Sequence, residues 1–146
     1  MKKLLLAALF LGALTMGKAQ AFSGSGDQKL DLGISAFGYG TGVTGTYDYG
    51  VMDWLSVGAG VDFYWGNNHH NGDDDTLFGY GRVNFHLGEL VGLPKNMDLY
   101  PGVNIGILNS GFGIGGHLGF RYFFDDKFGA FVELGSHGTI GVSINL

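Results

Sequence analysis

The sequence predicts an all-β fold: an eight-stranded antiparallel up-and-down transmembrane β-barrel, preceded by a signal peptide. Three observations support this prediction. The chain opens with a short apolar leader, and eight segments follow in which apolar residues alternate with small or polar ones. Glycine accounts for 29 of the 146 residues, and cysteine is absent. Tight curvature and close packing of strands would explain the glycines, and a closed barrel needs no disulfide to hold it together.

The first residues have the three parts of a secretory signal. Lys2 and Lys3 are positively charged, Leu4–Met16 is apolar, and Ala19-Gln20-Ala21 supplies a small-x-small cleavage pattern. The alternative is an uncleaved N-terminal anchor, but the apolar run is too short for a spanning helix. We therefore expect cleavage after Ala21, with the signal peptide at 1–21 and the barrel domain at 22–146.

Composition excludes several classes of protein. The chain after Ala21 carries five basic and thirteen acidic residues, a formal charge of −8, so it lacks the positive field that nucleic-acid binding requires. No Gly-X-Y period is present, which excludes collagen, and 45% hydrophobic residues with only two prolines argue against disorder. No later apolar stretch approaches the roughly 20 residues of a membrane helix. If this chain enters a membrane, it must do so as strands.

The eight segments can be placed by their alternation. The clearest of them puts Leu55, Val57, Ala59, Val61, Phe63 and Trp65 on one face. The expected strands are 30–39, 41–49, 55–65, 77–87, 97–107, 114–124, 128–135 and 139–146. Asn109–Gly113 is expected to form a turn. Pro101 cannot donate to a strand ladder, so a bulge or a local distortion is expected there.

The small and polar faces of these segments indicate which side meets lipid. They carry mainly Gly, Ser, Thr, Asn and Tyr, whereas a water-exposed sheet normally carries many Lys and Glu. A soluble barrel such as a lipocalin, with its apolar face inward, is the alternative. Six charged residues share the small and polar face: Asp31, Asp62, Arg82, Asp98, Arg121 and Glu133. If that face is the barrel interior, these charges must pair with one another. They then form a structural plug, and the other interpretation is a conducting pore.

Aromatic residues fall near the ends of the apolar faces, where interfacial girdles occur in membrane barrels. They are Tyr49, Phe63, Trp65, Phe85, Tyr122, Phe124 and Phe128. An even number of strands puts both termini on one side of the membrane. With the termini in the periplasm, we expect the turns at 51–54, 88–96 and 125–127 there as well, and the loop at 66–75 outside.

The chain resembles the small outer-membrane β-barrel families of Gram-negative bacteria, the eight-stranded group that includes OmpA-like and OmpX-like proteins. The final segment carries the most specific part of the resemblance: Thr139, Gly141, Ile144 and Leu146 match the spacing of the signal read by the outer-membrane assembly machinery, although the usual signal ends in an aromatic residue. The segment Tyr49–Gly58 looks like a strand–turn–strand unit of that superfamily. The Ala-Gln-Ala ending of the leader is similar to that of Bacteroidetes proteins.

The resemblance implies a location in the bacterial outer membrane. It also implies contact with outer-membrane lipid and lipopolysaccharide, delivery by the assembly machinery, and a monomeric state. The expected function is a structural or surface-interaction role with a lumen filled by polar side chains. A small pore or a carrier of hydrophobic ligands is the alternative.

The sequence shows no catalytic pattern, and we expect neither an enzyme nor a cofactor. The His-x-Ser-Asn motif of lipid-modifying barrels is absent, because Gly119 stands two residues after His117 and Gly88 two residues after His86. The polar loop could offer metal ligands, but adjacent side chains rarely converge on one ion, so no metal site is expected. We expect a surface-contact loop there instead, made by Asn67, Asn68, His69, His70, Asp73, Asp74 and Asp75.

Overall fold

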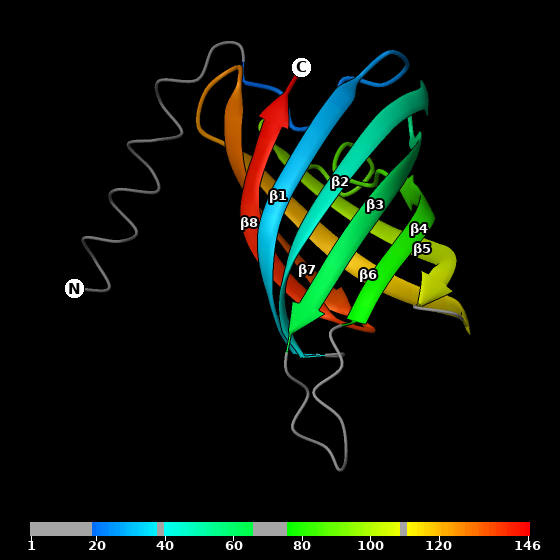
Figure 1. Ribbon diagram of the computed structural model, residues 1–146. Coiled ribbons are helices and arrows are strands. Elements are labelled where there is room, and N and C mark those ends of the chain that lie inside the picture. The colour runs from blue at the N-terminus through cyan, green and yellow to red at the C-terminus, as the bar shows by residue number, and fades with distance from the viewer. Residues whose placement is uncertain (1–18, 38–39, 66–75, 109–110) are drawn as a thin grey trace, which may run out of the picture.

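The computed structural model describes residues 19–37, 40–65, 76–108 and 111–146, and most of them lie in strands. The strands are β1 (Gln28–Phe37), β2 (Thr41–Met52), β3 (Leu55–Trp65), β4 (Thr76–Phe85), β5 (Met97–Leu108), β6 (Gly111–Phe123), β7 (Phe128–Gly135) and β8 (Gly138–Asn145). Each strand pairs antiparallel with its neighbours in chain order, and β8 pairs with β1 to close the barrel (Figure 1). None of the described residues forms a helix long and apolar enough to cross a membrane.

The predicted fold class is confirmed, and the strand limits differ in detail. The turn expected over Asn109–Gly113 is too long, because β6 begins at Gly111, which pairs with Leu108. Gly111 and Gly113 have the composition of a turn but continue the strand. A Cβ on Gly113 would lie 3.0 Å from the ring of Phe78, so the missing side chain leaves room for that ring inside the barrel.

The bulge expected at Pro101 is not found. Pro101 pairs with Leu118 in a ladder between β5 and β6 that runs without a register shift. On the other side, pairing with β4 ends at Asn84 and Gly102, so the nitrogen of Pro101 lies beyond the last paired residues of that ladder. Register shifts occur elsewhere, between Ser35 and Phe37 in β1 and between Gly50 and Met52 in β2.

Burial in this barrel is the reverse of that in a water-soluble one. Apolar side chains along the strands point outward, with Val61 53% and Ile105 50% exposed. Charged side chains point inward, and Arg82 and Arg121 are 2% and 0% exposed. An apolar outer wall around a polar interior is the arrangement of a barrel that meets lipid.

Exposed aromatic residues gather at both ends of the barrel wall. We call the end where β1 begins and β8 finishes the termini end, and the opposite one the far end. Exposed aromatic side chains near the termini end are Tyr47, Tyr49, Trp54, Phe85, Phe124 and Phe128; those near the far end are Phe37, Phe63, Trp65 and Phe112. Tyr122, also expected in a girdle, is half-buried and contacts Phe124.

The turn between β6 and β7 is closed by Asp125. Its carboxylate accepts the backbone N–H groups of Lys127 at 2.8 Å and Phe128 at 2.7 Å. These hydrogen bonds favour the charged form and lower the pKa of the Asp125 carboxyl. The sequence Asp-Asp-Lys therefore makes the tight turn expected there.

Candidate functional site

The centre of the lumen holds a fully buried arginine with two carboxylates. Arg121 of β6 places Nη2 at 2.5 Å from Oδ2 of Asp31 and at 2.7 Å from Oδ2 of Asp48. Its guanidinium carbon lies 4.2 Å from the ring centroid of Tyr100, in cation–π contact. Ser143 donates its hydroxyl to Asp31 at 2.5 Å. Arg121 is therefore held by side chains from three other strands, and Ser143 of β8 supports one of them, Asp31.

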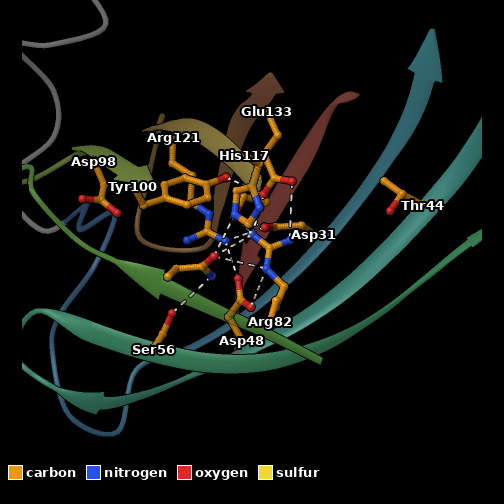
Figure 2. Close-up of polar contacts among 12 residues, drawn as sticks. Asp31, Thr44, Asp48, Ser56, Arg82, Asp98, Tyr100, His117, Arg121 and Glu133 are labelled. Carbon is orange, nitrogen blue, oxygen red and sulfur yellow. Dashed lines mark hydrogen bonds and ion pairs between the residues drawn. The ribbon is translucent and has the colours of Figure 1, made fainter. Parts of the chain in front are cut away.

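A second arginine extends this central network. Arg82 of β4 places Nη2 at 2.5 Å from Oε1 of Glu133 and Nε at 3.2 Å from Oδ1 of Asp48. Tyr100 donates its hydroxyl to the same Glu133 oxygen at 3.0 Å. Asp48 thus bridges the two arginines, and Figure 2 shows these side chains converging. Two positive and three negative side chains nearly balance in charge, as buried ions require.

A serine, a histidine and an aspartate form a chain near the termini end. Ser56 Oγ lies 2.8 Å from Nε2 of His86, whose Nδ1 lies 2.5 Å from Oδ2 of Asp98. Serine hydrolases use this order of contacts. Here Ser56 is 1% exposed. A cavity of about 260 Å³ beside the group is lined by His86 and Asp98 but not by the serine.

A third group lies toward the far end, around Asp62. This carboxylate is 0% exposed and accepts the hydroxyls of Tyr64 and Tyr80, each at 3.0 Å, and that of Thr44. His137 Nε2 lies 3.7 Å from Oδ2. Three hydroxyl donors and an imidazole thus replace water around this buried charge.

All six charged residues proposed from the sequence lie inside the barrel, each 3% exposed or less. The central network contains four of them: Asp31, Arg82, Arg121 and Glu133. Asp98 belongs to the serine–histidine chain and Asp62 to the hydroxyl group.

Several interior residues are absent from the set of six proposed from the sequence. They include Lys29, Asp48, Ser56, His86, Tyr100 and His117. Asp48 could have been found, because it shares a face with Thr44 and Thr46 in the alternation. The pairing of Ser56 with His86 could not, because the partners are 30 residues apart and meet only through the barrel register.

The residues of the expected assembly signal lie along β8 and just after it. The hydroxyl of Thr139 lies 3.0 Å from that of Ser35 inside the barrel. A Cβ on Gly141 would lie 2.1 Å from the carbonyl oxygen of Leu32, so glycine permits close packing there. Ile144 is half-buried and Leu146 is exposed.

The polar loop from Asn67 to Asp75 lies outside the described residues, as do residues 1–18 of the expected signal peptide. Within the described part of the chain, no three histidine, aspartate or glutamate side chains are placed to hold a metal ion.

Comparison with known proteins places the chain in a family and supports the fold. Residues 12–140 match the model described as "Family of unknown function (DUF6646)". A solved structure described as "De novo design of transmembrane beta-barrels" is similar, with a TM-score of 0.63 and 16% sequence identity over 86% of this chain and 99% of that chain. No curated protein matches. The chain has the fold of a transmembrane β-barrel and belongs to the DUF6646 family, whose function is unknown.

Proposed function

We propose that this chain is a non-enzymatic protein of the bacterial outer membrane, with a structural or surface-interaction role and a lumen filled by polar side chains. One observation carries the proposal: the barrel wall is apolar outside while charged side chains are buried inside. An apolar wall with aromatic residues at both ends suits a bilayer, and a closed sheet leaves no backbone edge unpaired in lipid.

The contacts across the lumen favour a plug over a pore or carrier. Arg82 on β4 reaches Glu133 on β7, and Arg121 on β6 reaches Asp31 on β1. These ion pairs cross the interior of a ring of eight strands instead of following one wall. An eight-stranded interior is only just wide enough for side chains, so the central network leaves little room for ions or a ligand.

The serine–histidine–aspartate chain supports a structural role. An acyl substrate must reach the serine oxygen, and Ser56 is buried and does not line the neighbouring cavity. The ring of Phe22 also covers His86, with centroids 3.5 Å apart and planes 5° apart. We expect a fluorophosphonate probe to leave the folded protein unlabelled. Labelling that disappears in Ser56→Ala would show a reactive nucleophile and contradict the non-enzymatic role.

The proposal includes an outer-membrane location, contact with lipid and lipopolysaccharide, delivery through the assembly machinery, and a monomeric state. It also includes membership of the OmpA-like and OmpX-like group, with the termini end in the periplasm. Delivery through the assembly machinery is supported by the match of the final segment to the assembly signal, at Thr139, Gly141, Ile144 and Leu146. Fractionation of cells expressing the full chain tests the location. The protein should sediment with outer membranes and migrate differently on gels before and after boiling.

Conductance separates the plug from the alternative functions. Folded protein in planar lipid bilayers should give no single-channel steps at high protein load, while a porin in the same bilayers gives them. Discrete steps from the wild-type barrel would establish a pore. Hydrophobic compounds that remain with the purified barrel, detected by mass spectrometry of its organic extract, would establish a carrier.

A further inference from the structure

The residues just before β1 form a strap across the termini end of the barrel. We define the strap as Gln20–Asp27. Asn145 Nδ2 of β8 donates to the carbonyl oxygen of Gln20 at 3.3 Å, and Ala21 N–H donates to the carbonyl oxygen of Lys95 at 2.8 Å. Lys95 belongs to the connection between β4 and β5, which lies opposite β8 in a ring of eight strands. The strap therefore spans the mouth, at the end where Figure 1 places the C-terminus.

The start of the strap is packed into the mouth. Ala21 is 0% exposed and lies in an apolar cluster with Ala19 and Phe123, which are 5% and 0% exposed. The ring of Phe22 stacks on His86, directly above the serine–histidine chain. These contacts make the strap the cover of the lumen at this end.

The end of the strap is tied to β1 and β2. The Asp27 carboxylate accepts Nζ of buried Lys29 at 2.5 Å and the hydroxyl of Ser23 at 2.8 Å. The N–H of Gly50 donates to the backbone carbonyl oxygen of Asp27 at 2.8 Å. Gly24, with φ of +89°, adopts a backbone conformation that other residues rarely take. The strap is thus held along its whole length.

These contacts bear on where a leader would be removed. Two small-x-small patterns overlap directly after the apolar run, Gly17-Lys18-Ala19 and Ala19-Gln20-Ala21. A cut after Ala21 would remove the strap's hydrogen bonds to Asn145 and Lys95 and its packing on Phe123. A cut after Ala19 would keep both hydrogen bonds and the packing of Ala21 on Phe123, and it would remove only Ala19 from that cluster.

We propose that the leader is cleaved between Ala19 and Gln20, and not after Ala21 as expected from the sequence alone, so that the mature chain keeps the entire strap as a lid on the periplasmic mouth. This inference rests on the proposed outer-membrane function. The strap adds a second closure to that of the central network: the strap lies at the mouth, and the network lies inside the lumen. The ring of Phe22 in the strap also covers one face of His86, the partner of Ser56.

The N-terminal residue of the mature protein tests the cleavage site. The full chain is expressed in a Gram-negative host, and the heat-modifiable species from its outer membrane is digested for tandem mass spectrometry. We expect an N-terminal peptide that begins at Gln20. A peptide that begins at Phe22, shorter by one glutamine and one alanine, would overturn the proposal while leaving the outer-membrane function intact. A chain that keeps its leader and stays out of the outer membrane would instead contradict the proposed function.

Paired substitutions test whether the strap is docked. Phe22→Ala removes the stack on His86, and Ser25→Ala changes an exposed position of the same strap. We expect faster hydrogen exchange at the Ala21 amide in Phe22→Ala and unchanged exchange in Ser25→Ala. In the wild-type protein, slow hydrogen exchange at the Ala21 amide would show directly that this amide is hydrogen-bonded to Lys95 and that the strap is docked. An unprotected Ala21 amide in the folded mature protein would show that the strap is not docked.

Discussion

Replacing Arg121 by methionine tests the central network. Methionine keeps much of the apolar stem but removes the guanidinium, which holds Asp31 at 2.5 Å and Asp48 at 2.7 Å. Both carboxylates are 1% exposed, so neither can recover solvation from bulk water. The Arg121→Met variant should therefore be much less stable than the wild type.

The size of the effect follows from what each carboxylate keeps. Removing one partner of a buried ion pair costs about 3–5 kcal/mol. Asp31 retains the hydroxyl of Ser143 at 2.5 Å and Asp48 retains Nε of Arg82 at 3.2 Å, which places the cost near the lower end. Loss of the cation–π contact with Tyr100 adds roughly 0.5–2 kcal/mol. We expect a loss of about 4 kcal/mol in the free energy of unfolding, close to a thousandfold change in the unfolding equilibrium.

Urea unfolding of the barrel in lipid vesicles measures this loss, followed by tryptophan fluorescence and by migration on unboiled gels. The double variant Arg121→Met/Asp31→Asn removes opposite charges together and should recover about 1 kcal/mol or more of the single variant's loss, because coupled residues are non-additive. Glu89→Gln, in a connection between strands, serves as the control. If Arg121→Met unfolds within about 0.5 kcal/mol of the wild type, the arginine does not hold the lumen together.

Three further predictions concern the inner wall, the lipid face and a turn. Gly119→Ala places a Cβ 2.1 Å from the buried ring of Tyr100 and should lower the free energy of unfolding by about 1–3 kcal/mol. Gly116→Ala is the control, because the atom nearest to its new Cβ is 3.7 Å away, and it should be nearly neutral. Equal urea midpoints for the two variants would contradict this. Val103→Lys puts a charge in the middle of the lipid face of β5 and should lower the free energy of unfolding by about 2–4 kcal/mol. Val91→Lys, at an exposed position outside the strands, should change it little. Equal losses for the two variants in the vesicle assay would count against the assigned lipid face. Because the pKa of Asp125 is lowered in the folded state, its carboxylate stabilises the β6–β7 turn at pH values above the unfolded pKa near 4. This contribution should disappear as the pH falls through the lowered pKa. The unfolding free energies of the wild type and Asp125→Ala, measured by urea titration, should therefore converge in acid, and a difference that persists there would refute the assignment.

Alternation was enough to predict the barrel and its inner face. In β3, Val57 and Val61 point outward while Ser56 and Asp62 point inward, as the pattern indicates. Strand ends were harder to predict, because Gly111 and Gly113 have turn composition yet lie in β6. The role of Gly113 depends on Phe78, which is distant in sequence and meets this glycine only in the closed barrel.

The charged residues of the interior could be predicted as a set, but their partners could not. Which carboxylate meets Arg121 depends on the strand register, which sets the heights of β1, β2 and β6 along the barrel axis. Asp48 shows the difference: its face followed from alternation, but its position between the two arginines did not. The strap before β1 lacks any period, so only its tertiary contacts reveal it.

The two native tryptophans test the central claim that the apolar wall faces lipid. Trp54 and Trp65 are the only tryptophans in the sequence, and both are exposed, Trp54 in the turn between β2 and β3 and Trp65 at the opposite end of β3. Unmodified protein folded into vesicles should lose fluorescence when the lipids carry bromine atoms, and more strongly when the bromines lie near the headgroups than at the ends of the acyl chains. Unchanged fluorescence in all brominated vesicles, from protein that resists unfolding on unboiled gels, would mean that the wall faces water and that the barrel is soluble.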